Sequence, residues 1–260
     1  MRPPVLCSVM QKNRAAVAAE LRRRLPRIEG FAPKTLPFGL SAVDRHLPQG
    51  GLACGALHEV VPDAGDTAAA FGFMTALLAR VPRARPLVFV MPGYGLGQYG
   101  RLYGHGLRTL GLDPARLLMV ETAHRKETLW ALEEALRSGA PAAVAGVIDK
   151  LDLKLSQRLQ LAAADAGLPL FLLRPALLLE SSAAATRWRV GTAEATRDRF
   201  GLFARARWHL LLERCRNGRA GEWMVEYDHV AHRFSLAAAL ADPAFSRSAG
   251  ETAVAKTHRA

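Results

Sequence analysis

The order strand, loop and helix between residues 57 and 80 is the feature that most limits how this chain can fold. Residues 57–61 form a β-branched run whose apolar residues are Leu57, Val60 and Val61. Residues 62–66 have the loop sequence Pro-Asp-Ala-Gly-Asp, and an Ala-, Phe- and Leu-rich helical pattern covers residues 67–80. In such a loop, backbone N–H groups and the helix N-terminus can hold an anion. The segment therefore predicts a strand-to-helix turn of the phosphate-binding type.

The side chains of this loop do not suit a phosphate. Gly65 and Thr67 match the end of the pattern G-x-x-x-x-G-K-[ST], but Asp66 stands at the lysine position. Val60 stands at the first glycine position. A carboxylate in place of the ammonium group repels the β- and γ-phosphates. We interpret the segment as a degenerate phosphate loop, so we expect neither ATP nor Mg²⁺ as a cofactor and no catalytic activity.

Two other interpretations of the loop stay open. It can be an ordinary βα turn that never bound a nucleotide. Alternatively, the chain is a divergent ATPase that takes the missing cation from elsewhere, for example from Arg80, Arg83 or Arg85 of a neighbouring protomer.

Beyond the loop, apolar strand patterns alternate with helical patterns. Strands are expected at 86–92, 116–121, 142–149 and 168–174, and helices at 101–110, 124–138 and 155–166. This alternation predicts an α/β fold with a mainly parallel central sheet that helices cover on both faces. After residue 175, strands at 187–190, 208–215 and 222–228, with the turn pair Asn217 and Gly218, predict a late antiparallel hairpin.

Composition sets further limits on the class of protein. The chain has 260 residues, half of them hydrophobic, which suffices for one large domain with extensions. No apolar run reaches the length of a membrane span, and the apolar segment near residue 1 is too short for a signal peptide. We therefore expect a cytoplasmic protein. Cys7, Cys54 and Cys215 are too scattered for a disulfide framework or zinc site, and we expect no metal at His229 and His232.

We expect three parts along the chain. Residues 1–34 are expected to form an N-terminal helix with a linker, because apolar residues recur at helical spacing over residues 8–25 before Pro26, Gly30 and Pro33. Residues 35–236 form the core domain. Residues 237–260 are rich in Ala and Ser with little apolar periodicity, and we expect them to be disordered.

The net charge of +12 is compatible with nucleic acid, with an acidic partner, or with solubility alone. Candidate contacts with DNA or a protein partner lie in the late basic region: Arg187, Trp188, Arg189, Arg214, Arg216 and Arg219. Arginines with interleaved aromatic residues suit phosphate contact and base stacking. The alternative, which we prefer, is that strand alternation places Trp188 and Trp208 in the core and the arginines on a solvated face.

The segment before the loop carries the most specific pattern. It matches the lead-in T-G-x-x-x-L-D-x-x-L-x-G-G-L-x-x-G of RecA-like recombinases at Gly39, Asp44, Leu47, Gly50, Gly51, Leu52 and Gly55. Glycines there tolerate positive φ and deliver the chain to the first core strand. Residues 35–236 therefore resemble a RecA-like core.

The resemblance to RecA-like recombinases predicts where catalytic acidic residues would stand, at the ends of two strands. In ATP-hydrolysing recombinases, the strand that corresponds to residues 86–92 is followed by an acidic residue that orients the attacking water. In this chain the strand ends at Pro92 instead. The strand at 142–149 ends in Asp149, as in a Walker B segment, where a carboxylate can hold Mg²⁺ through water. Since the other catalytic parts are missing, we expect Asp149 to act as a strand-end or helix-capping carboxylate.

Four phrases extend the resemblance to a narrower family. They are residues 38–44, 55–60, 181–189 and 212–219. In them the chain resembles the ImuA family of damage-inducible mutagenesis proteins, which is sometimes grouped with the cell-division inhibitor SulA.

That resemblance implies a non-catalytic adaptor subunit of an SOS-induced translesion-synthesis complex. The implied partners are an ImuB-like inactive Y-family polymerase homologue and an error-prone replicative-type polymerase. Contacts with RecA and with DNA near the nucleoid are further expectations. A SulA-like inhibitor of the division protein FtsZ is the alternative, against which the length and the N-terminal helix argue.

Overall fold

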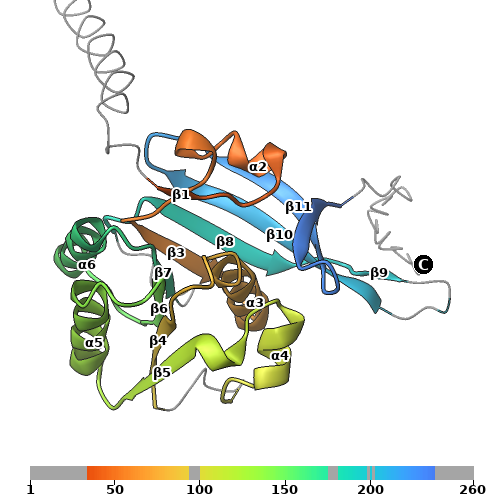
Figure 1. Ribbon diagram of the computed structural model, residues 1–260. Helices are drawn as coiled ribbons and strands as arrows, with labels where there is room; N and C mark the ends of the chain where they lie inside the picture. Colours follow the sequence, from red (N-terminus) through yellow and green to blue (C-terminus); the bar gives the residue numbers. More distant parts are fainter. Residues whose placement is uncertain (1–33, 94–99, 175–180, 198–199, 201–202, 238–260) are drawn as a thin grey trace, which may run out of the picture.

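The computed structural model describes residues 34–93, 100–174, 181–197, 200 and 203–237. The expected N-terminal helix and the expected C-terminal tail lie outside these residues, apart from their innermost ends. Most of the described chain belongs to one large sheet with helices packed on it (Figure 1).

The parallel part of the sheet contains the phosphate-loop strand, β3, between β8 and β7. Its order is β8-β3-β7-β6-β4-β5, with each neighbouring pair parallel. The strands are β3 (Leu57–Pro62), β4 (Leu87–Pro92), β5 (Leu117–Thr122), β6 (Ala143–Val147), β7 (Leu170–Leu173) and β8 (Thr186–Thr192). The chain thus alternates strands and helices as expected, and β3 is buried along its whole length, as in a parallel sheet covered on both faces.

An antiparallel part continues the same sheet from β8. The order is β8-β10-β11-β12, and short β9 pairs with β10. These strands are β9 (Thr196–Arg197), β10 (Phe203–Cys215), β11 (Gly221–Asp228) and β12 (Arg233–Leu236). Asn217 has φ +64° in the turn between β10 and β11, as the hairpin prediction requires. The mixed sheet confirms the predicted α/β, RecA-like class with a late antiparallel hairpin.

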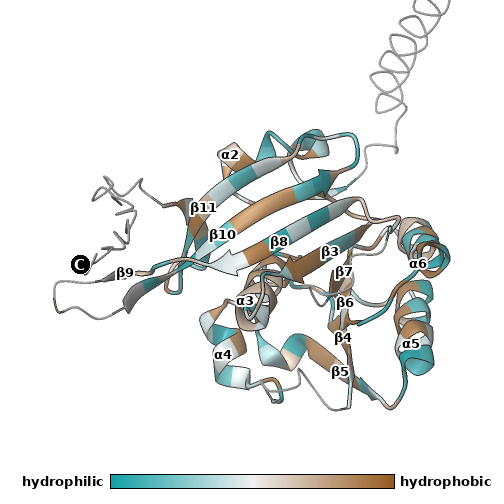
Figure 2. Ribbon diagram, turned by 180° about the vertical axis from the view of Figure 1, so that it is seen from behind, coloured by the Kyte–Doolittle hydropathy of each residue, from teal (hydrophilic) through white to brown (hydrophobic). Residues whose placement is uncertain are grey.

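Helices cover the two faces of the sheet unequally. One face packs against α3 (Thr67–Leu78), α2 (Ser41–Asp44) and α4 (Gly104–Thr109), and the other packs against α5 (Arg125–Arg137) and α6 (Leu153–Ala166). No helix crosses in front of β8, β10 and β11 in Figure 2, where hydrophobic and hydrophilic residues alternate along these strands. That alternation is typical of strands with one buried and one solvated face.

The RecA-like lead-in forms a compact entry to β3. A short pair of strands, β1 (Thr35–Leu36) and β2 (Leu52–Ala53), surrounds α2 and the turn η2 (Pro48–Gly50). The Asp44 carboxylate accepts hydrogen bonds from the backbone N–H groups of Phe38, Gly39 and Leu40. Gly39 has φ +80°, which explains why this position favours glycine.

Helix α4 is shorter than the expected helix at 101–110. It begins only at Gly104 and contains a second glycine, Gly106. Both residues lower helix propensity. No helix among the described residues is long and apolar enough to cross a membrane.

Candidate functional site

The turn between β3 and α3 is much tighter than a loop that wraps a phosphate. Strand β3 continues through Pro62 because it pairs with β8, where Val60 lies opposite Trp188 and Pro62 opposite Val190. Only residues 63–66 remain for the turn, and the Asp66 N–H donates to the Asp63 carbonyl at 2.9 Å. Val60, at the first glycine position of the pattern, is therefore a fully buried strand residue.

The Asp66 carboxylate is occupied by the chain itself. Its Oδ2 accepts the backbone N–H of Thr192 at 2.9 Å, and its Oδ1 accepts the Thr192 hydroxyl at 2.8 Å. Asp66 precedes α3 but makes no side-chain cap for it. The residue at the lysine position thus ties the turn to the end of β8.

Gly191 allows this close approach. A Cβ atom at residue 191 would lie 2.4 Å from Oδ2 of Asp63 and 3.4 Å from Oδ2 of Asp66. The Arg189 guanidinium lies 3.9 Å from the Asp63 carboxylate. Two carboxylates therefore face the end of β8, and Gly65 with φ +86° allows the turn to close. This arrangement presents negative charge where a phosphate loop presents N–H donors and an ammonium group.

Asp149 lies two residues beyond the end of β6, at the carboxyl edge of the sheet. It lines a recess with Pro92, His124 and Arg125 whose volume is about 60 Å³. Ligand pockets usually measure roughly 300–1,000 Å³. The recess is thus too small for a nucleotide in this conformation.

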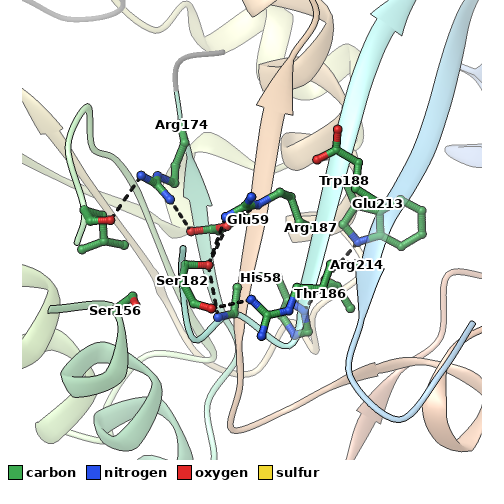
Figure 3. A network of polar contacts seen from close by, with 12 residues as sticks. His58, Glu59, Ser156, Arg174, Ser182, Thr186, Arg187, Trp188, Glu213 and Arg214 are labelled. Carbon is green, nitrogen blue, oxygen red and sulfur yellow. Dashed lines mark hydrogen bonds and ion pairs between the residues drawn. The ribbon is translucent and has the colours of Figure 1, made fainter. Parts of the chain in front are cut away.

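A buried charge cluster connects the same strand to distant parts of the chain (Figure 3). Glu59 of β3 is fully buried, and its Oε1 accepts Nη1 of Arg174 at 2.7 Å. Its Oε2 accepts Nε of Arg187 at 2.8 Å and the Ser182 hydroxyl at 2.9 Å. The Arg174 side chain is 2% exposed and that of Arg187 13%. One carboxylate thus lies between two guanidinium groups, an arrangement that is strongly destabilised when one partner is removed.

His58 makes a second buried connection beside the cluster. Its Nδ1 lies 2.8 Å from Oγ1 of Thr186, and its Nε2 lies 2.9 Å from the Ala53 carbonyl. The Trp188 indole N–H donates to the same Thr186 oxygen at 3.1 Å. A neutral imidazole with its proton on Nε2 satisfies all these groups. Burial is the main cause that lowers the His58 pKa to about 4. The hydrogen bond to the Ala53 carbonyl raises this pKa, and the Arg216 charge lowers it.

The late basic residues have separate environments. Trp188 is fully buried and Trp208 is 5% exposed, so neither ring offers a face for a base. Arg187 pairs with Glu59 and Arg189 with Glu213 at 2.5 Å. The Arg214 guanidinium donates to the carbonyl oxygen of Ser182.

Arg216 and Arg219 are exposed at the β10–β11 turn. Arg216 donates to Oε1 of Gln160 at 3.0 Å, and the Arg219 N–H donates to the His46 carbonyl at 3.0 Å. The candidate DNA contacts therefore do not form one continuous free basic surface.

The remaining candidate residues show no metal arrangement. His229 Nδ1 lies 3.2 Å from the Thr109 carbonyl, and His232 packs against Gly111. Over the described ranges, no group of three or more His, Cys, Asp or Glu residues is arranged to hold a metal ion.

Glu59, Arg174 and Ser182 are not recognisable as a group from the sequence alone. The available indication was that Glu59 interrupts an apolar strand and Arg174 follows one. Buried charges of this kind need partners. Those partners lie 115 and 128 positions away from Glu59, so only the register of the sheet identifies them.

Similarity to known proteins identifies the family of this chain. Protein ImuA of Caulobacter vibrioides, found in two strains of that organism, is 34% identical over 226 residues, covering 80% of this chain and 90% of the relative. The chain belongs to the ImuA family. No family model matches the chain. Two of the phrases by which the sequence resembles the ImuA family, residues 55–60 and 181–189, supply Glu59, Ser182 and Arg187, which the fold joins in the buried cluster.

Proposed function

We propose that the chain is a non-catalytic adaptor of a DNA-damage-induced translesion-synthesis complex. Membership in the ImuA family associates it with damage-inducible mutagenesis. In the proposed complex it binds an ImuB-like inactive Y-family polymerase homologue and, through that assembly, an error-prone replicative-type polymerase. Its place of action is the cytoplasm at the nucleoid, with RecA as a further candidate partner.

The closed turn at residues 63–66 carries this proposal. A phosphate in the usual position would have to displace the two hydrogen bonds between Asp66 and Thr192. It would then face two carboxylates with no lysine between them, which is electrostatically unfavourable. A RecA-like shell of this kind keeps its sheet and helices for contacts with other proteins.

The divergent-ATPase alternative meets a geometric obstacle within one chain. Arg80, Arg83 and Arg85 follow the C-terminal end of α3, whereas the turn precedes its start. A helix of 12 residues is about 18 Å long, so these arginines do not reach the turn of their own chain. Arg189 of the same chain does lie near the turn, 3.9 Å from the Asp63 carboxylate, but it pairs with Glu213 at 2.5 Å. None of these four arginines therefore offers ATP a free cation at the turn.

A nucleotide titration tests the non-catalytic part of the proposal. Calorimetry with Mg-ATP should give no binding in the micromolar range, because the site lacks the charge-assisted lysine contact. A RecA-like protein with an intact phosphate loop serves as the positive control. Micromolar affinity, or ATP turnover that Asp149→Asn abolishes, would contradict the proposal.

A binding assay tests the adaptor part. The tagged full chain should retain an ImuB-like polymerase homologue in a pull-down with purified proteins, and the complex should elute together in size-exclusion chromatography. Failure of the two purified proteins to associate at micromolar concentrations would overturn the adaptor role. FtsZ polymerisation in the presence of the chain should be unchanged.

A further inference from the structure

Four arginines that border α4 and the β4 entry have no carboxylate partner in the part of the chain that the structure describes. Arg83 and Arg85 lie between α3 and β4, Arg108 lies in α4, and Arg116 ends the turn η4 (Pro114–Arg116). Eight other arginines of the described core form ion pairs: Arg101, Arg137, Arg158, Arg174, Arg187, Arg189, Arg205 and Arg207. Arg214, Arg216 and Arg219 of the late basic region share with the four the lack of a carboxylate partner among the described residues. The four therefore contribute positive charge that the described fold leaves uncompensated.

Backbone hydrogen bonds hold part of this group in place. Nη2 of Arg116 donates to the carbonyl oxygens of Pro82 at 2.7 Å and Arg85 at 3.0 Å. Nε of Arg85 donates to the Ala140 carbonyl at 2.8 Å. Burial first, and the Arg83 charge second, lower the Arg116 pKa, while Asp113 opposes them. Since the fold holds like charges together, a bound anion would relieve their repulsion.

An exposed aromatic ring lies next to these arginines. Tyr103, immediately before α4, is 70% exposed, and its ring centroid lies 5.2 Å from that of His105. His105 and Arg108 line a hollow of about 210 Å³ with Pro114 of η4. The hollow joins the aromatic pair to the turn that carries Arg116, and α4 lies beside α3 in Figure 1.

We propose that this surface, defined as Tyr103, Arg83, Arg85, Arg108 and Arg116, binds single-stranded nucleic acid. The guanidinium groups suit the backbone phosphates, which they can contact through two parallel hydrogen bonds. The exposed ring of Tyr103 suits stacking with an unpaired base. The proposal goes beyond the adaptor function and does not depend on it, because the closed turn at residues 63–66 uses none of these residues.

The two arginine regions differ in how much charge they have available. Arg187 and Arg189 of the late basic region are compensated by Glu59 and Glu213. A phosphate that contacts them must compete with carboxylates at 2.5–2.8 Å. Arg83 and Arg108 are exposed without such a competitor, and so are Arg216 and Arg219. What favours the surface around α4 is its exposed Tyr103 ring, because Trp188 and Trp208 of the late basic region are buried.

The test compares two triple variants of the full chain that lose the same charge. Arg83→Gln/Arg85→Gln/Arg108→Gln removes three arginines of the proposed surface and keeps Arg116, whose hydrogen bonds are structural. The matched control is Arg137→Gln/Arg216→Gln/Arg219→Gln, which removes three exposed arginines elsewhere, two of them from the late basic region. Thermal melting of both variants verifies that they fold.

Fluorescence anisotropy with labelled oligothymidine at two or more salt concentrations measures the effect. The surface variant should bind about tenfold or more weakly, and the slope of log K against log salt should fall by about 2, since each single-strand phosphate contact contributes about 0.7. The control should change little. Tyr103→Ala should weaken binding about fivefold or more without changing the slope.

Three results would overturn the proposal. The first is salt-insensitive binding or none, and the second is an equal loss in the two triple variants or a larger loss in the control. The third is that a polyglutamate peptide binds this surface and the oligonucleotide does not, which would assign it to an acidic protein partner.

Discussion

Strand β3 contains one acidic residue, Glu59, and the turn that follows it contains Asp66. The two carboxylates have different partners and different roles. Glu59 lies in the middle, fully buried, and forms ion pairs with two arginines from distant segments. Asp66 lies in the turn after the strand, partly exposed, and accepts hydrogen bonds from the uncharged Thr192. The buried group therefore supports the fold, whereas the turn group closes what is a nucleotide site in related folds. Their removal should have unequal effects.

The largest effect should follow from Glu59→Gln. This substitution keeps the shape but removes the buried carboxylate that Arg174 and Arg187 share, so the free energy of unfolding should fall by about 3–5 kcal/mol. Urea unfolding followed by circular dichroism measures the change.

Glu213→Gln is the matched control for this variant. It breaks the ion pair with Arg189, whose partners are 21% and 24% exposed, and should cost about 1 kcal/mol or less. If Glu59→Gln does not fold, Glu59→Leu/Arg174→Met/Arg187→Met should restore folding, because hydrophobic replacement of a whole buried ion group is often tolerated. Equal losses of unfolding free energy in Glu59→Gln and Glu213→Gln would show that the buried cluster stabilises the fold no more than a partly exposed ion pair.

The next largest effect should come from His58, the neighbour of Glu59 on β3. Its folded pKa of about 4 lies below its ordinary value of 6.5, so the unfolded chain binds the proton more readily. The stability that neutral His58 contributes is present above pH 6.5 and is lost as pH falls towards 4. Between pH 7.5 and pH 5 the loss should be about 2 kcal/mol.

His58→Gln provides the comparison for this pH effect. The variant lacks the titrating ring, so its unfolding free energy should fall less over the same pH interval than that of the parent chain. The difference between the two slopes isolates His58 from the carboxylates that both chains share. Parallel slopes would mean that His58 is readily protonated in the folded chain.

Local patterns predicted the elements of this fold well. The expected strand at 57–61 and helix at 67–80 correspond to β3 and α3, because apolar periodicity and the Pro and Gly residues between them are local properties. The predicted parallel order with a late hairpin is also confirmed. By contrast, β12 was not predicted, since a strand of four residues offers too little pattern.

The register between distant strands determines the tight β3–α3 turn and the orientation of the β8 residues, which local sequence patterns do not indicate. The pairing of Pro62 with Val190 extends β3 and shortens the turn, and nothing within residues 57–67 indicates it. The same register decides which face each residue of β8 occupies, placing Trp188 in the core and Arg187 beside Glu59. Alignment with the motif therefore drew attention to Asp66 and Val60, but it could not indicate the contacts that these residues make in the fold.

The smallest effect should follow from Thr192→Val, which removes the hydroxyl that donates to Oδ1 of Asp66 and keeps the side-chain shape. Because this hydrogen bond lies at a partly exposed turn, the free energy of unfolding should fall by only about 0.5–1.5 kcal/mol. A double-mutant cycle with Asp66→Asn separates the pair from other contacts, since any coupling energy must come from their direct interaction. Mg-ATP should still not bind to Thr192→Val, because releasing one hydrogen bond leaves both Asp63 and Asp66 in place and supplies no cation. If the substitution instead cost as much as Glu59→Gln, the turn would belong to the structural core, and the contrast between the two acidic groups of this strand would fail.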